Sequence, residues 1–303
     1  MSKLDKYRGI IPAFYACYDE QGEVSPEKVQ ALASYYYEKG VKGLYVGGSS
    51  GECIYQTVAE RELVLENVMA AVGGKMTIIA HIAAPSTRDS VRLAKHAESL
   101  GVDALAAIPP IYFVLPEHAI EAYWTNMVEA TSLDFIIYNI PQTTGYSLSI
   151  GLFQKMLENK QVIGVKNSSM PVQDINVFKN NANREVVIFN GPDEQFVGGR
   201  AMGADSGIGG TYGVMPELFL KADQLIRENK FTEALDIQNA INEIVFKMVT
   251  CQGNLYDVMK QILALNGMPV GRVRGPLAQT VAEDQPIIEE ARQMIAKAIA
   301  KFV

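Results

Sequence analysis

The sequence predicts an α/β protein, a closed (β/α)8 TIM barrel with a C-terminal helical extension. Short runs rich in Val, Ile, Tyr and Phe recur along the chain, each followed by a longer amphipathic stretch. This alternation is typical of repeated βα units. The runs are almost wholly apolar rather than alternating, as are strands of a parallel sheet that is buried on both faces. Eight such units fall within residues 9–208, the number that a closed barrel needs.

The strands are expected in order along the chain, at residues 9–15, 43–46, 76–82, 104–108, 135–139, 162–165, 187–190 and 206–208. Helical patterns lie between them, among others at residues 25–39, 58–72, 87–100, 116–130 and 150–158. Ser25 followed by Pro26 indicates an N-cap with proline at the first helical position, and Gly40 and Gly101 stand where helices should end. The alternative, an open doubly wound sheet, usually carries a glycine-rich nucleotide-binding turn after an early strand, and no such turn occurs here.

The last part of the chain contains helical patterns only, at residues 217–228, 231–250, 255–266 and 285–302. One barrel helix accounts for the first of these patterns. We therefore expect a barrel core over residues 1–214 and, over residues 215–303, the last barrel helix with a C-terminal helical domain.

Composition excludes several classes of protein. With a formal net charge of -7, a broad surface for nucleic acid or anionic membrane is not expected. The N-terminal residues contain no hydrophobic segment of the secretory kind, so we expect a cytoplasmic protein. Three widely spaced cysteines, Cys17, Cys53 and Cys251, and three scattered histidines indicate neither a disulfide framework nor a metal site.

Lys166 is the first candidate for chemistry. Reactive residues of a (β/α)8 barrel lie at the C-terminal ends of strands and in the loops that follow, and Lys166 directly follows the predicted strand 162–165. Partial desolvation in the barrel mouth lowers the pKa of an amine and allows it to attack a carbonyl carbon, forming a Schiff base. From position alone, a lysine that leans into solvent or pairs with a carboxylate fits equally well.

Tyr138 ends the preceding strand, so strand adjacency should place its phenol beside Lys166. A cationic imine withdraws electrons from a neighbouring bond, and a phenol can move the proton that this chemistry requires. Taken without Lys166, Tyr138 is equally well explained as a core aromatic residue whose hydroxyl bonds to the backbone.

Small and acidic residues follow three further strands. Residues 47–52 read Gly-Gly-Ser-Ser-Gly-Glu, and small residues let backbone N–H groups approach an anion, although a plain loop has the same composition. Asp193 and Glu194 offer acceptors, or form the acidic start of a helix. Glycines that permit either close packing or ligand approach follow the eighth strand, at Gly207, Gly209 and Gly210. Together with Lys166 and Tyr138, these strand ends predict one active site at the barrel mouth.

Four motifs resemble the pyruvate-dependent class I aldolases of the N-acetylneuraminate lyase and dihydrodipicolinate synthase family, and among them the lyases most closely. The motifs are residues 43–52 (GLYVGGSSGE), 138–141 (YNIP), 164–166 (GVK) and 203–205 (GAD), and the resemblance extends from about residue 9 to at least residue 276. It implies a Schiff-base lyase of carbohydrate metabolism that acts on a pyruvate-containing substrate, forms a homotetramer, and needs no metal or organic cofactor.

The resemblance also implies roles for individual residues. Lys166 matches the Schiff-base lysine, Tyr138 the tyrosine that transfers protons, and Ser49 the hydroxyl residue bonded to that tyrosine. Ser50 matches the residue whose backbone helps hold the pyruvoyl carboxylate. Tyr112 matches a tyrosine that reaches into the active site of an adjacent subunit. The remaining substrate contacts implied by the family are Ser168, Gly191, Asp193, Glu194, Gly209 and Gly210.

Within the family the residues favour a lyase. Synthases more often have two threonines at the positions of Ser49 and Ser50, and they place an arginine where this chain has Thr143. That arginine binds the carboxylate of an amino-acid semialdehyde through two hydrogen bonds. Without it, the affinity of this chain for the synthase substrate should be much lower. We therefore expect cleavage of a 2-keto sugar acid, with N-acetylneuraminate as the leading substrate, to pyruvate and an aldehyde, N-acetylmannosamine.

Three alternatives are kept. Pro192 and Gly210 stand where lyases usually carry an aromatic residue and a serine, which is compatible with a different keto-deoxy sugar acid. A dihydrodipicolinate synthase or another pyruvate-dependent aldolase or dehydratase would use the same lysine. A non-catalytic barrel that binds a keto acid is the alternative from another class, although binding alone does not need Lys166.

Overall fold

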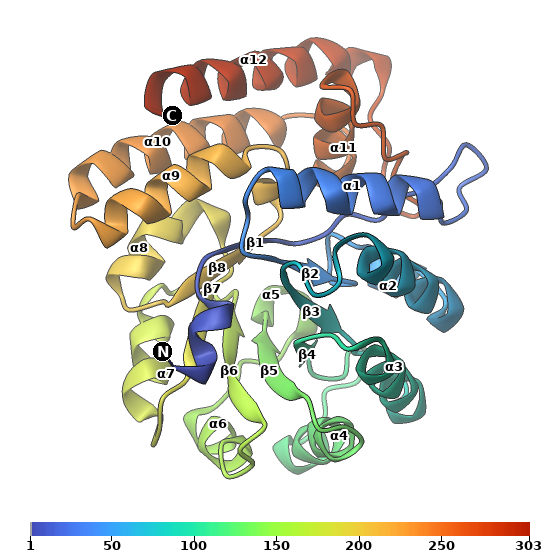
Figure 1. Cartoon of the computed structure of the whole chain (residues 1–303), viewed down its shortest axis with the longest axis vertical. Helices are drawn as coiled ribbons and strands as arrows, with labels where there is room; N and C mark the ends of the chain where they lie inside the picture. The colour runs from blue at the N-terminus through green and yellow to red at the C-terminus, as the bar shows by residue number, and fades with distance from the viewer. Residues whose placement is uncertain (1) are drawn as a thin grey trace.

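The computed structural model describes residues 2–303 and consists of a barrel of parallel strands surrounded by helices, with further helices along one side (Figure 1). The predicted (β/α)8 barrel is confirmed. Its strands are β1 (Ile10–Pro12), β2 (Gly43–Val46), β3 (Thr77–His81), β4 (Ala104–Ala107), β5 (Asp134–Asn139), β6 (Val162–Asn167), β7 (Val187–Asn190) and β8 (Ser206–Gly209).

The sheet runs in the order β1-β8-β7-β6-β5-β4-β3-β2, and every strand pair is parallel. A bridge between Ala13 and Tyr45 brings β1 next to β2, and the backbone N–H of Phe14 donates to the carbonyl of Tyr45 at 2.9 Å. The sheet is therefore nearly closed, and the C-terminal ends of all strands meet at one mouth.

Helices alternate with the strands and cover the outside of the barrel (Figure 1). Ser25 accepts a hydrogen bond from the backbone N–H of Lys28, which confirms the predicted N-cap, and α3 ends at Gly101 in the left-handed conformation that glycine favours. The sequence patterns did not single out α5, α7 or α8, which are short. The helices are α1 (Pro26–Glu38), α2 (Val58–Val72), α3 (Thr87–Leu100), α4 (Glu117–Glu129), α5 (Pro141–Thr144), α6 (Ile150–Met156), α7 (Gln173–Asn181), α8 (Phe196–Ala201) and α9 (Pro216–Arg227).

Strand β6 is longer than expected, and this changes the place of Lys166. The ladder continues past Val165, pairing Tyr138 with Lys166 and Lys166 with Phe189. Lys166 therefore lies within the strand rather than just after it, since backbone pairing does not depend on the apolar pattern that set the predicted end. Its neighbours Tyr138 and Phe189 belong to the apolar core that fills the barrel.

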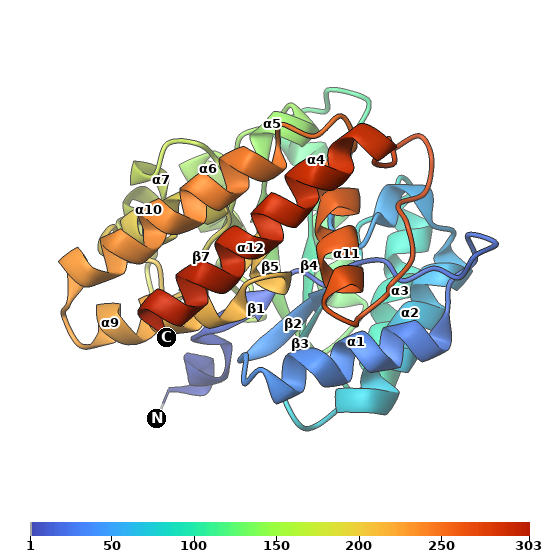
Figure 2. The same ribbon diagram turned by 90° about the horizontal axis from the view of Figure 1, so that it is seen from above.

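Three helices beyond α9 lie together on one side of the barrel: α10 (Phe231–Met248), α11 (Leu255–Leu265) and α12 (Gln285–Phe302). Figures 1 and 2 both show α12 beside α10, and Figure 2 shows α12 running past α11. The four predicted C-terminal helices are confirmed, while the domain boundary at residue 214 stays a prediction.

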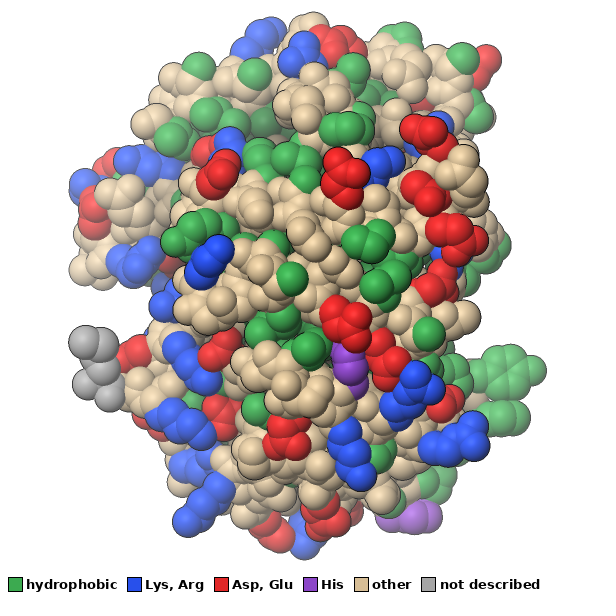
Figure 3. Space-filling model, turned by 45° about the vertical axis from the view of Figure 1, so that its right-hand side comes forward, with side chains coloured by type: hydrophobic (Ala, Val, Ile, Leu, Met, Phe, Trp, Pro, Cys, Tyr) green, Lys and Arg blue, Asp and Glu red, His purple; other side chains and the backbone are tan. Residues whose placement is uncertain are grey.

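The surface shows no broad basic face in the view of Figure 3, where acidic and basic side chains are intermingled. Within residues 2–303, no helix combines the length and apolarity that crossing a membrane requires. The same residues contain no group of three or more His, Cys, Asp or Glu side chains that could hold a metal ion. All three cysteines are free.

Candidate active site

Lys166 is almost completely buried, and its amine lies between two tyrosine rings. Its Nζ lies 4.1 Å from the ring centroid of Tyr45 and 4.0 Å from that of Tyr138. No carboxylate within residues 2–303 comes within ion-pair distance of it. Burial lowers the pKa of Lys166 from 10.5 to about 7, although the nearby Asp193 and Cys53 act in the opposite direction. A large fraction of this amine is therefore uncharged near neutral pH.

Tyr138 is buried beside Lys166, as strand adjacency predicted. Burial raises the pKa of its phenol to about 12, against the effect of the Ser168 and Ser49 hydroxyls that face it. The phenol is therefore protonated near neutral pH. The resemblance paired Tyr138 with Ser49, and the structure places the Ser168 hydroxyl at the same phenol as well.

The turn after β2 is shaped by its own backbone hydrogen bonds. The N–H of Gly51 donates to the carbonyl of Gly48 at 3.0 Å, and the N–H of Glu52 donates to the carbonyl of Ser49 at 3.0 Å. Gly47 has φ 76°, which a residue with a Cβ adopts only with strain. The result is a tight turn that presents Ser49 and Ser50 to the barrel mouth.

His81, for which the sequence indicated no role, forms a hydrogen bond with the first residue of this turn. Its Nδ1 lies 2.8 Å from the carbonyl oxygen of Gly47. Burial, followed by the nearby charge of Arg61, lowers the pKa of His81 to about 3, so the ring is neutral and donates its Nδ1–H to that oxygen. The ring also packs edge-on against Tyr138 at a centroid distance of 6.1 Å. No spacing in the sequence indicated this contact, because it joins three strands.

Asp193 is buried near Lys166, and only one of its two carboxylate oxygens has a hydrogen-bond partner among residues 2–303. Its Oδ2 accepts hydrogen bonds from the backbone N–H and the hydroxyl of Thr211, both at 2.7 Å. Its Oδ1 is buried and has no hydrogen-bond partner among residues 2–303. Burial raises the pKa of Asp193 to about 7, although the Thr211 hydrogen bonds lower it in part. A Cβ on Gly209 would collide with this carboxylate, so Gly209 makes room for Asp193.

These side chains surround a cavity of about 260 Å³. It brings together ten positions that the sequence had singled out: Ser49, Ser50, Tyr138, Lys166, Ser168, Gly191, Pro192, Asp193, Glu194 and Gly210. Gly209 does not line it and lies behind Asp193. Tyr112 is not brought to this cavity either, since its side chain is 92% exposed.

One wall of the cavity is formed by residues that no sequence pattern had indicated. Leu255, Tyr256 and Met259 of α11 line it, and Tyr256 faces the Ser50 hydroxyl. These residues lie on a helix far along the chain from every recognised motif, so only the packing of α11 against the barrel identifies them.

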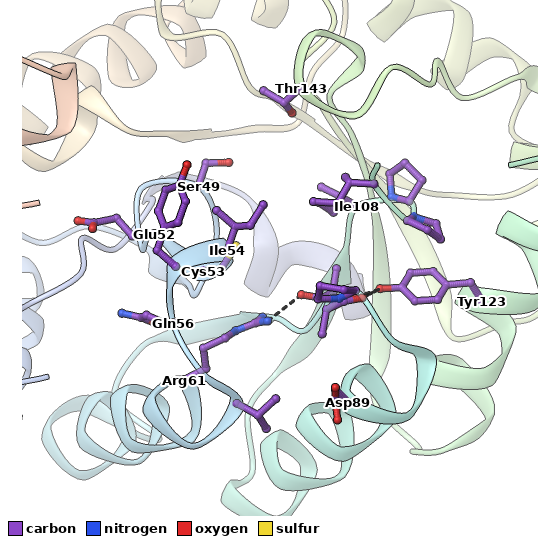
Figure 4. A pocket seen from close by; sticks show the side chains of 18 of the residues that line it. Ser49, Glu52, Cys53, Ile54, Gln56, Arg61, Asp89, Ile108, Tyr123 and Thr143 are labelled. Carbon is purple, nitrogen blue, oxygen red and sulfur yellow. Dashed lines mark hydrogen bonds between the residues drawn. The ribbon is translucent and has the colours of Figure 1, made fainter. Parts of the chain in front are cut away.

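A second cavity of about 440 Å³ adjoins the first, and Ser49 and Tyr256 line both (Figure 4). Arg61 is buried in its wall and donates to the carbonyl oxygens of His81 and Ala83, both at 2.7 Å. Figure 4 shows Ser49 and Arg61 on the side of β2 and α2, with Ile108 across the cavity.

The fold and the site are those of a (β/α)8 barrel that can present an uncharged amine, flanked by a phenol and a serine-bearing turn, to a carbonyl compound. The sequence profile of the dihydrodipicolinate synthetase family matches residues 6–295, and the chain belongs to this family. The resemblance inferred from the four motifs is thereby confirmed.

Among the similar proteins are N-acetylneuraminate lyases and a sialic acid aldolase. The chain is 59% identical over 305 residues to an N-acetylneuraminate lyase of Mediterraneibacter gnavus, covering 100% of this chain and 97% of the relative. It is 35% identical to N-acetylneuraminate lyase 2 of Escherichia coli over 87% of this chain and 86% of the relative. The wild-type sialic acid aldolase of Ruminococcus gnavus superposes with a TM-score of 0.98 at 59% identity, covering 99% of this chain and 100% of that one. A catalytic lysine mutant of that aldolase superposes with a TM-score of 0.99 at 58% identity, with both chains covered completely.

Proposed function

We propose that this protein is a carbon-carbon lyase that cleaves N-acetylneuraminate to pyruvate and N-acetylmannosamine through a Schiff base on Lys166. The observation that carries the mechanism is a buried amine without a carboxylate partner among residues 2–303, whose pKa is about 7. The substrate is supported by the lyases that are 59% and 35% identical to this chain.

The reaction follows from the positions of the two groups. The Lys166 amine attacks the keto carbon, and the Tyr138 phenol donates a proton as the former keto oxygen leaves as water. The Tyr138 phenolate left by that step then takes the proton of the hydroxyl on the second carbon from the iminium carbon. The bond between that carbon and the carbon next to the iminium breaks, and its electron pair moves into the iminium to give an enamine. Protonation of the enamine carbon and hydrolysis release pyruvate and restore the amine.

The remaining side chains suit the rest of the substrate. The turn over residues 47–52 offers the hydroxyls of Ser49 and Ser50, and its backbone N–H groups, to the carboxylate of the keto acid. Beyond the reacting carbon, Asp193 and Glu194 line the cavity, and the carboxylate of Glu194 accepts hydrogen bonds from the hydroxylated tail.

A panel of 2-keto acids tests the substrate, with pyruvate release read by a coupled assay. N-acetylneuraminate should be cleaved fastest. Cleavage of only a shorter keto-deoxy sugar acid would overturn the substrate while keeping the aldolase. Rapid condensation of pyruvate with aspartate semialdehyde would instead indicate a synthase, for which Thr143 offers no charged carboxylate donor. Absence of turnover with every compound would favour a barrel that only binds keto acids.

Imine formation should depend on pH as a low-pKa amine requires. Only the uncharged Lys166 reacts, so the rate at subsaturating pyruvate should rise about ten-fold between roughly pH 6 and pH 8 and then level off. An ordinary lysine would keep gaining up to about pH 10. Borohydride trapping in single-turnover samples measures this rate.

Asp193→Asn provides the control for this pH dependence. The carboxylate of Asp193 raises the pKa of Lys166, so its removal should move the midpoint to lower pH. A midpoint that stays above about pH 9 in the wild type would contradict the assignment of Lys166 as the nucleophile.

We also propose that the protein works as a cytoplasmic homotetramer in which Tyr112 completes the site of an adjacent subunit. Tyr112 has φ 83°, a conformation that is costly for a tyrosine, and it lies with Phe113 and Val114 in an exposed apolar loop. Such a loop suits burial against a second copy of the chain.

Mixed oligomers test this sharing. Subunits with Tyr112→Phe and subunits with Lys166→Ala should each be nearly inactive alone. When mixed oligomers form, activity should reappear, because an intact Lys166 then meets an intact Tyr112 from its neighbour. No recovery in oligomers that mass spectrometry shows to be mixed would count against a shared site.

Substrate affinity should reflect the two positions that depart from the usual lyase pattern. Pro192 and Gly210 both line the cavity and offer no side-chain donor, so KM for N-acetylneuraminate should exceed that of a lyase with an aromatic residue and a serine there. The double change Pro192→Tyr and Gly210→Ser should lower KM about ten-fold, as one neutral hydrogen bond contributes about 1–1.5 kcal/mol. A Cβ at residue 210 would lie 3.1 Å from the Ser50 Oγ, so that hydroxyl must shift slightly. Unchanged KM with kcat preserved would show that the tail lies elsewhere.

A further inference from the structure

A buried ion pair joins the C-terminal helices to the active-site turn. The Nζ of Lys260 on α11 lies 2.6 Å from the Oε1 of Glu52, and both side chains have 0% exposure. The other Glu52 oxygen accepts a hydrogen bond from the backbone N–H of Arg274 at 2.8 Å, and Lys260 also donates to the carbonyl of Arg272 at 3.0 Å. The two residues lie 208 positions apart in the chain, so the contact is purely tertiary.

Glu52 is also held in a constrained backbone conformation. Its φ is 54°, in the left-handed region that a residue with a Cβ adopts only with strain. Such a conformation persists where surrounding contacts determine it, and both oxygens of Glu52 are held from the C-terminal region. Its backbone N–H donates to the carbonyl of Ser49, so the side chain that is held and the turn that presents Ser49 are one unit.

Figure 4 shows the Glu52 carboxylate directed away from Arg61, although both residues line the second cavity. The nearby guanidinium is therefore not the partner of Glu52. The charge of Glu52 is instead directed toward α11.

The same helix supplies the opposite wall of the catalytic cavity. Tyr256 lies one helical turn before Lys260, and Met259 directly precedes it. Both line that cavity, and Tyr256 faces the hydroxyl of Ser50. The ion pair therefore sets the position of α11 relative to the turn over residues 47–52, and both are walls of one site.

A gain in folding stability does not explain why a glutamate and a lysine occupy positions 52 and 260. Desolvating two charges is costly, and a well-packed apolar pair of the same volume is often as stable or more so. An ion pair differs from an apolar pair in specifying one geometry, because the attraction depends on distance and the donors need aligned acceptors.

We propose that Glu52 and Lys260 are positioning residues that hold the Ser49–Ser50 turn in register with α11, so that the donors of the turn are preorganised for the substrate carboxylate. The proposal rests on the function proposed above and adds a long-range determinant of keto acid binding. Neither Glu52 nor Lys260 lines the catalytic cavity, so neither is expected to touch the substrate.

The test removes both charges together. Glu52→Gln alone leaves the Lys260 charge buried without a partner, so the double variant Glu52→Gln/Lys260→Met is used to keep the protein folded. We expect the pyruvate concentration that half-saturates borohydride trapping to rise about ten-fold or more, the effect of misplacing one charge-assisted hydrogen bond, with the maximal trapping rate close to that of the wild type. KM for N-acetylneuraminate should rise in parallel, with kcat much less affected.

Arg272→Met is the matched control. Arg272 pairs with Asp257 on the same helix at 2.7 Å and does not contact the turn. The Arg272→Met variant should have lower thermal stability, but the pyruvate concentration that half-saturates trapping should stay that of the wild type. A double variant with lowered stability and wild-type half-saturation would show that the pair is only structural, and would overturn the proposal. Wild-type protein without label on Lys166 would overturn the proposed function itself, and this proposal with it.

Discussion

Lys166→Ala should abolish turnover, with a loss of at least about 10⁴-fold in kcat, because no other group can supply the imine. In the wild type, borohydride added with pyruvate should trap a stable adduct on Lys166 alone. Its mass gain is one pyruvic acid less one oxygen atom. Trypsin does not cleave after the alkylated lysine, so the label should appear on the peptide that runs from Gln161 to Lys179.

Lys260 makes this test specific. Lys166 and Lys260 are both buried, but Lys260 is paired with a carboxylate and Lys166 is not. A label on Lys260, on another lysine or on none would contradict the mechanism. Lys160→Ala, a change at an exposed lysine just before β6, should leave both labelling and turnover intact.

A stability measurement shows whether a Lys166 variant is inactive because it lacks the amine or because it is unfolded. The folded pKa of Lys166 lies below its unfolded value of about 10.4, so the native state binds its proton less well. The resulting penalty is full below about pH 7 and disappears above the unfolded value. Lys166→Met, which keeps the volume without the charge, should therefore be at least as stable as the wild type at pH 7 in urea unfolding.

Tyr138→Phe should lower kcat by about 10²–10⁴, the range for a lost general acid or base. The Tyr138 ring centroid lies 4.0 Å from the Lys166 amine, and its phenol, whose pKa is about 12, is protonated near neutral pH. Single-turnover trapping with pyruvate should be affected less than cleavage, because cleavage requires a proton to move in a further step. Measuring both rates on the same sample separates the two steps.

Tyr45→Phe is the matched control for Tyr138→Phe. The two rings lie at nearly equal distances from the Lys166 amine, but the Tyr45 hydroxyl has no hydrogen-bond partner among residues 2–303. Losing that hydroxyl should change kcat by no more than about three-fold. Equal losses in the two variants would mean that ring packing, and not proton transfer, accounts for the effect of Tyr138.

Much of the barrel could be predicted from sequence because its signals are local. Strands β2 and β7 and helices α2, α3 and α12 have the expected bounds, since apolar runs and amphipathic periods arise from neighbouring residues. The same holds for Lys166 and Tyr138. Each lies one residue before the C-terminal end of its strand, and in a parallel barrel consecutive strands lie side by side.

What the sequence determined by itself was thus the order of βα units, the mouth at which they end, and the residue types gathered there. Only the tertiary structure decided which contacts make those residues reactive. The two rings that desolvate Lys166, the neutral His81 under the turn, and the wall contributed by α11 all join segments far apart in the chain. Burial and pKa depend on everything packed around a group, whatever its distance in sequence, and no local pattern records that packing.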